Sequence, residues 1–96
     1  MESIMVKKLT EEEKKEMLIP DRPAGTGPWA VWECEPSTFD WHYDSLEKAY
    51  LYEGKVKVRT KDQKVELGPG DFVIFPKGLS CTWTVEKKVK KVYLFE

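Results

Sequence analysis

Short stretches in which apolar and polar residues alternate fill most of the chain from residue 29 onward, and they predict β-strands. Residues 55–59 alternate strictly between a cation and valine, and Phe39, Trp41 and Tyr43 recur at every second position. Residues 72–75 are apolar throughout, as in a strand buried on both faces. Since successive side chains of a strand point to opposite faces, each alternating pattern assigns one face to a core.

Glycine, proline and charged pairs divide these stretches and predict the turns between them. We expect turns at residues 53–54, 61–63, 68–71, 76–78 and 87–88, with a last strand over 89–95. Six or more short strands with such punctuation are typical of an all-β barrel or sandwich.

The first residues follow a different pattern. Thr10 and the three glutamates after it form a capping-box pattern, which predicts a short helix over residues 11–18. Pro20 and Pro23 end it, and a glycine-rich loop follows. The chain therefore divides into an N-terminal helix and loop segment, residues 1–28, and a barrel, residues 29–96, within one domain.

Composition narrows the class of protein. The chain has 96 residues and a formal net charge of −1, so nucleic-acid and anionic membrane partners are not expected. The N-terminus is too charged for a secretory signal, so we expect a cytoplasmic protein. Its two cysteines, Cys34 and Cys81, are expected to be free thiols.

Two punctuated strand pairs carry a resemblance to the cupin superfamily. Glu47 is followed by six residues and Gly54, and Gly70 by five residues, Pro-Lys-Gly, two residues and Cys81. These spacings are similar to those of the two cupin motifs. The residue pattern from Phe39 to Trp83 resembles that of small single-domain cupins related to the cupin domain of ureidoglycine aminohydrolase. The resemblance implies a cupin-type, RmlC-like jelly-roll barrel with its site in the barrel mouth.

The same resemblance implies that a typical cupin binds a divalent metal through three histidines and a glutamate. In one register the histidine positions hold Trp41, Tyr43 and Cys81, and only Glu47 keeps its ligand identity. Strand parity favours this register because it directs the aromatic face inward, so no cofactor is predicted.

A shift of the motif by one residue would restore a metal site. In that register Asp40 and His42 replace the two aromatic residues, and with Glu47 and Cys81 they offer oxygen, nitrogen and sulfur donors suited to zinc. The alternative metalloprotein therefore depends on which face of residues 40–43 points into the barrel.

The favoured register predicts an organic pocket. Trp41, Tyr43, Glu47, Cys81 and Trp83 are its expected ligand-binding residues, and the expected ligand is a small organic molecule. An enzyme is the alternative, a hydrolase, isomerase or lyase with Glu47 as general acid or base and Tyr43 or Cys81 assisting.

Simpler roles compete with these chemical ones. Glu47 can instead pair at the surface with a lysine such as Lys48, and Cys81 can be a small packed residue. A homodimer is expected, since a small barrel leaves strand edges open. The segment around Ile4 and Val6 is a candidate for pairing with a second copy.

Overall fold

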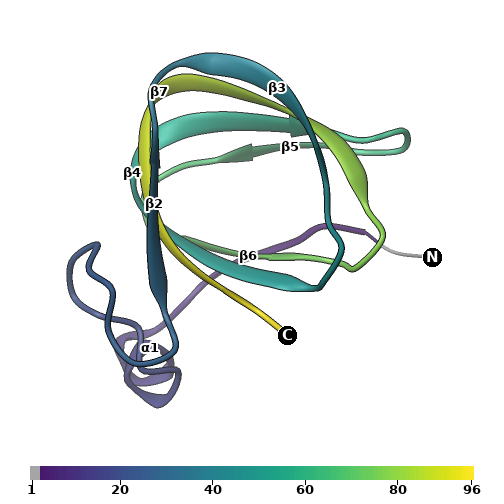
Figure 1. The fold of residues 1–96 in the computed structure, drawn as a ribbon. Helices are drawn as coiled ribbons and strands as arrows, with labels where there is room; N and C mark the ends of the chain where they lie inside the picture. The colour runs from purple at the N-terminus through teal and green to yellow at the C-terminus, as the bar shows by residue number, and fades with distance from the viewer. Residues whose placement is uncertain (1–2) are drawn as a thin grey trace.

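The chain folds into seven strands and one short helix, which a computed structural model describes for residues 3–96. In chain order the elements are β1 (Met5–Lys8), α1 (Glu11–Glu16), β2 (Ala30–Cys34), β3 (Ser37–His42), β4 (Glu47–Arg59), β5 (Lys64–Leu67), β6 (Asp71–Phe75) and β7 (Ser80–Phe95). The strands curl into a ring, and α1 lies outside it (Figure 1). The predicted all-β barrel with a short N-terminal helix is confirmed.

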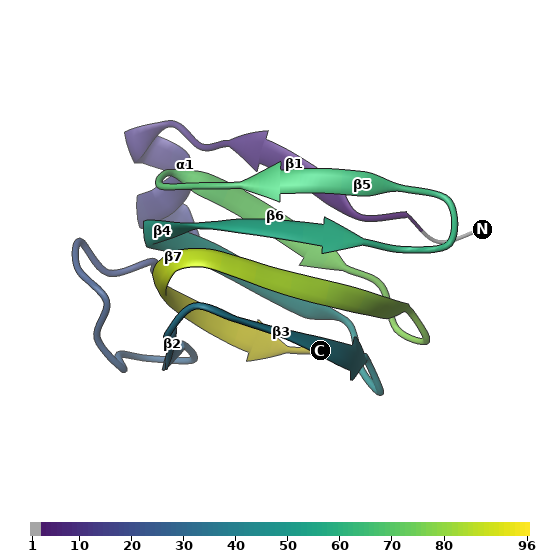
Figure 2. The same cartoon turned by 90° about the horizontal axis from the view of Figure 1, so that it is seen from above.

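The barrel has two walls that share its two longest strands. All pairings are antiparallel, in the order β1-β6-β4-β7-β2, with β3 also on β7 and β5 also on β4. The front wall consists of β5, β3, the second half of β4 and the first half of β7 (Figure 2). The back wall contains β1, β6, β2 and the other halves of β4 and β7.

Two of the predicted turns are bends inside long strands. Residues 53–54 lie within β4 and residues 87–88 within β7, where the pairing register shifts between Leu51 and Val56. Gly54 has a φ of 109°, and a Cβ there would lie 2.5 Å from the carbonyl oxygen of Lys88. A glycine inside a strand marks a bulge or a close approach of backbones as well as a turn. The prediction of turns was wrong at these places. Whether such a glycine marks a turn or a bulge depends on the partner strand and not on the local sequence.

Side chains pack on both faces of the back wall. The inner core lies between the walls and includes Leu51, Val58, Phe75 and Val89. The outer core is a separate cluster of Ile19, Trp29, Tyr50, Phe72 and Val92. The indole of Trp29 donates a 2.9 Å hydrogen bond to the carbonyl of Met17. The segment after α1 therefore covers the outside of the back wall.

Helix α1 shows the predicted capping box but ends early. The Thr10 hydroxyl accepts a hydrogen bond from the Glu13 backbone, and the Glu13 carboxylate accepts one from the Thr10 backbone. The helix ends at Glu16 rather than at residue 18, because Leu18 takes a left-handed conformation that brings Ile19 into the outer core. Helix α1 has six residues, and no helix within residues 3–96 is long and apolar enough to cross a membrane.

Strand β1 belongs to the barrel, although it lies in the N-terminal segment. It pairs with β6 of the same chain, from Met5 opposite Ile74 to Lys8 opposite Asp71, and Ile4 packs in the inner core. Ile4 is thus occupied within its own chain. The other edge of β1 pairs with no strand of residues 3–96, so the homodimer stays a prediction.

Candidate functional site

Strand β3 sets the orientation of the residues that decide between the two motif registers. Phe39 and Trp41 of β3, together with Tyr43 just after it, line one cavity inside the barrel. The side chains between them point outward. The Asp40 carboxylate accepts a 2.7 Å hydrogen bond from the Thr82 hydroxyl, and His42 Nδ1 lies 2.8 Å from the Ser80 hydroxyl. This is the orientation that strand parity predicts.

The alternative four-ligand set is therefore not assembled. Asp40 and His42 are exposed on the outer face of β3, while Glu47 and Cys81 are buried inside the barrel. No group of three or more His, Cys, Asp or Glu side chains within residues 3–96 is placed to hold a metal ion. In the favoured register Trp41 has no atom that can bind a metal ion, so the residues present do not fit the metal of a typical cupin.

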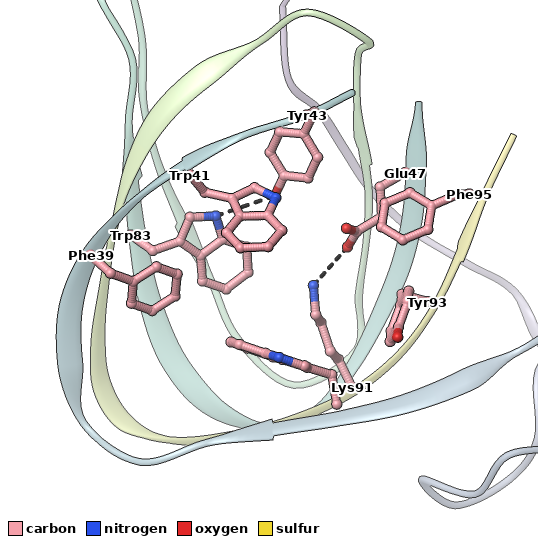
Figure 3. A pocket seen from close by; sticks show the side chains of 9 residues that line it. Phe39, Trp41, Tyr43, Glu47, Trp83, Lys91, Tyr93 and Phe95 are labelled. Carbon is pink, nitrogen blue, oxygen red and sulfur yellow. Dashed lines mark hydrogen bonds and ion pairs between the residues drawn. The ribbon is translucent and has the colours of Figure 1, made fainter. Parts of the chain in front are cut away.

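The cavity between the walls is small and largely aromatic. It has a volume of about 280 Å³, and it is lined by Trp32, Phe39, Trp41, Tyr43, Glu47, Trp83, Lys91, Tyr93 and Phe95 (Figure 3). Trp41 and Phe95 are 48% and 50% exposed and form its rim. All the lining residues except Glu47 and Lys91 are aromatic. Such a cavity, apolar with few polar groups, is typical of a small-molecule site.

Glu47 and Lys91 form an ion pair in the wall of this cavity. Glu47 begins β4, Lys91 lies in β7, and Lys91 Nζ is 2.7 Å from Glu47 Oε2. The two residues are only 4% and 5% exposed. Both side chains point into the space between the aromatic rings (Figure 3). The cavity therefore holds a fixed positive and a fixed negative charge next to each other in apolar surroundings.

Four aromatic rings surround the ammonium of Lys91. Its Nζ lies 4.8 Å from the ring centre of Trp83, 5.0 Å from that of Trp32, 5.7 Å from that of Tyr93 and 5.9 Å from that of Phe75. Burial lowers the pKa of Lys91, and the Glu47 carboxylate opposes that shift. The rings and the carboxylate thus stabilise a cation that burial disfavours.

Tyr43 is a structural wall of the cavity. Its ring stacks on Phe75 with centres 4.7 Å apart, and its hydroxyl accepts a 3.2 Å hydrogen bond from the indole of Trp83. Burial raises the pKa of Tyr43, so its phenol remains neutral at physiological pH. Trp83 is likewise buried, beneath Phe39 and Trp32. These contacts give Tyr43 and Trp83 a role in shaping the cavity and do not support Tyr43 as an acid–base helper.

Comparison with known proteins assigns this chain to a family. The sequence profile of the EutQ-like cupin domain matches residues 22–93. The chain belongs to the EutQ-like cupin family. A DUF861 family protein from Thermotoga maritima is 41% identical to this EutQ-like cupin, with a TM-score of 0.87 over 98% of this chain and 100% of that one. The resemblance to small cupins that the motifs predicted is confirmed.

More distant structures share the fold of this EutQ-like cupin. The EutQ protein of Clostridium difficile is 22% identical, with a TM-score of 0.63 over 94% of this chain and 64% of that one. A putative ethanolamine utilization protein Q from Salmonella typhimurium LT2 is 19% identical, with a TM-score of 0.61 over 96% and 68%. A comparison with curated proteins gives no match.

The cupin motif contains only one residue of the charged pair in this EutQ-like cupin, Glu47. Glu47 was expected to face the barrel or to pair with a surface lysine, and Lys48 instead binds Glu96 at 2.7 Å. Lys91 is not among the predicted site residues, and a lysine is rarely fully buried. Lys91 lies two residues from Val89 and two from Tyr93, which pack in the inner core. Strand parity therefore places the Lys91 side chain on the same inner face.

Cys81 lies behind the cavity wall of this EutQ-like cupin. It pairs with Trp41 across the β3–β7 ladder and is buried in the inner core, but it is not among the residues that line the cavity. Burial raises the pKa of its thiol to about 11. A protonated, buried thiol is a poor nucleophile, so the structure favours the packing role of Cys81 over the catalytic one.

The two cysteines should differ in their reaction with iodoacetamide. At pH 8 we expect Cys34, which is only partly buried, to be alkylated first, and Cys81 only after the chain opens. Peptide mass spectrometry over time measures both rates, and Cys34→Ser leaves Cys81 as the single target. Alkylation of Cys81 in the folded Cys34→Ser variant as fast as in urea would show that its thiol is accessible and activated.

Proposed function

We propose that this EutQ-like cupin binds a small organic molecule in its aromatic cavity, and that Glu47 and Lys91 bind the polar group of that molecule. The observation that carries the proposal is the buried Glu47–Lys91 ion pair in the wall of an open cavity. Buried ion pairs add little to stability, because apolar residues of similar volume serve a core at least as well. A charged pair in this position is better explained by a ligand than by packing.

The pair has hydrogen-bonding capacity to offer. An ammonium carries three N–H donors and a carboxylate has two acceptor oxygens, and the hydrogen bond between Lys91 and Glu47 uses one donor and one oxygen. A ligand group that both accepts and donates, such as an amide or a urea, can bind the two residues together. The rings of Trp32, Phe39 and Tyr93 would contact its apolar or flat part.

Substitution of Glu47 tests the proposal. Thermal-shift screening of a panel of sugars, amides and ureas identifies a ligand, and isothermal titration gives its Kd. We expect Glu47→Gln to weaken binding by about 10- to 100-fold, because a charge-assisted hydrogen bond of about 1.5–3 kcal/mol is lost.

Asp40→Asn is the matched control, since Asp40 is a carboxylate on the opposite face of β3 and its loss should leave the Kd unchanged. Binding that survives Glu47→Gln at full strength would contradict the proposal, as would a panel in which no compound binds.

A further inference from the structure

The amine of Lys91 is the strongest nucleophile that the cavity can present. Its Nζ lies in the wall of the cavity, 2.7 Å from a carboxylate oxygen that can take its proton. A lysine can attack a carbonyl carbon when it is desolvated in an apolar pocket, and an adjacent base can take the proton of a nucleophile. Lys91 and Glu47 meet both conditions, and burial also lowers the pKa of Lys91.

We propose that Lys91 forms a Schiff base with a small aldehyde or ketone that enters the aromatic cavity. This inference rests on the proposed function, because the carbonyl compound is taken to be the bound organic molecule. It goes further by naming the reactive group and the bond that forms.

The reaction is balanced within the ion pair. Lys91 first passes a proton to Glu47, which leaves a neutral amine beside a carboxylic acid. The nitrogen lone pair then forms a bond to the carbonyl carbon, and the oxygen receives the proton that the nitrogen loses. Glu47 finally protonates this hydroxyl, which leaves as water while the nitrogen forms a double bond to carbon. The products are a protonated imine on Lys91, the Glu47 carboxylate and one water, and no oxidant or reductant is needed.

The surroundings suit the product as well as the reactant. A protonated imine is a cation, so it keeps the attraction of the Glu47 carboxylate and of the aromatic faces of Trp32 and Trp83. The low exposure of Lys91 and Glu47 also limits the water that would hydrolyse the imine. The cavity of about 280 Å³ leaves room for a small carbonyl compound beside the lysine.

The chain contains a matched lysine for comparison. Lys48 forms an ion pair with Glu96 at the same distance of 2.7 Å, but these side chains are 31% and 52% exposed. Lys48 therefore shares the carboxylate partner of Lys91 and lacks its apolar surroundings. A difference in reactivity between the two lysines isolates the effect of the cavity.

Reductive trapping with benzaldehyde tests the inference. The full-length protein is incubated at pH 7 with one equivalent of benzaldehyde and sodium cyanoborohydride, and the benzylated lysines are located by peptide mass spectrometry. We expect labelling of Lys91 to exceed that of Lys48 by about tenfold or more. Glu47→Gln should slow labelling of Lys91 by about tenfold or more, since the acid–base group is lost. Labelling spread over surface lysines, with Lys91 unmodified in the wild-type protein, would overturn the inference.

Two controls separate this inference from the proposed function. Lys91→Arg keeps a cation opposite Glu47 and should remove the label while near-UV circular dichroism remains that of the wild type. Benzamide has the same ring and cannot form an imine, so its binding is measured by titration. If benzamide binds and Lys91 is not labelled, the binding function stands and the Schiff base is wrong. If Lys91 is labelled and benzamide does not bind, the reactive amine stands and the hydrogen-bonding role of the pair falls.

Discussion

Replacing Glu47 alone by leucine should lower the free energy of unfolding by about 3–5 kcal/mol, whereas replacing Glu47 and Lys91 together by leucine and methionine should leave it near the wild-type value. The single change leaves the Lys91 ammonium buried without its carboxylate. The double change removes both charges and puts apolar groups among the rings. Urea unfolding of the wild type, both single variants and the double variant gives the coupling energy.

The surface pair of Lys48 and Glu96 is the control for this cycle, and its removal should change stability by about 1 kcal/mol or less. If the double variant were as unstable as Glu47→Leu alone, the ion pair would stabilise the fold in its own right. A ligand would then not be needed to explain the burial of Glu47 and Lys91.

The stability deficit of Glu47→Leu should also depend on pH. Burial lowers the pKa of Lys91 in the folded protein below its ordinary value of 10.5, and the Glu47 carboxylate opposes this shift. Glu47→Leu removes that opposing effect, so the pKa of Lys91 should fall further. Between the lowered pKa and 10.5 the unfolded chain binds more protons at this lysine than the folded chain, so stability rises with pH. Unfolding midpoints measured at increasing pH should therefore show the deficit shrinking, and a constant deficit would show that Lys91 keeps its charge.

Gly54→Ala should be among the most damaging single substitutions in the barrel. The new Cβ would lie 2.5 Å from the Lys88 carbonyl oxygen and 2.6 Å from the Val89 Cα, at a φ of 109°. Backbone strain and overpacking together should cost about 3 kcal/mol or more, because the contacts are with backbone that cannot turn away. Thermal unfolding measures the loss.

Gly78→Ala separates the two causes of that loss. Gly78 has a φ of 89°, and a Cβ there meets no atom within 4 Å, so only the backbone term of about 1 kcal/mol remains. Equal losses at the two glycines would show that β4 and β7 can move apart at the bend.

The sequence predicted the barrel and the face of β3 for the same reason: the two-residue period of a strand is a local property. Alternation alone placed Trp41 inside and His42 outside, and the structure has them so. The bends in β4 and β7 could not be predicted in this way. Gly54 marks a bend because Lys88 and Val89 cross it, and nothing near Gly54 in the chain reports that crossing.

Of the charged pair in the site, one residue could be predicted from the sequence and the other could not. Spacing to Gly54 singled out Glu47, but its partner Lys91 lies 44 positions further along the chain, and only the pairing of β4 with β7 joins them. A charged residue inside a β-core runs against the general rule that lysines lie at the surface. Cys81 was attractive as a motif position, and its burial in the structure favours a packing role.

The distribution of tryptophans makes the barrel its own optical reporter. Of the four tryptophans in the chain, Trp32, Trp41 and Trp83 line the cavity, and Trp29 lies in the outer core. A molecule that entered the cavity would meet three indole rings beside a charged pair, so its binding would change the intrinsic emission of the unlabelled protein. Trp29 lies in the outer core on the other side of the back wall, so its emission should instead follow unfolding of the segment after α1 that covers this wall.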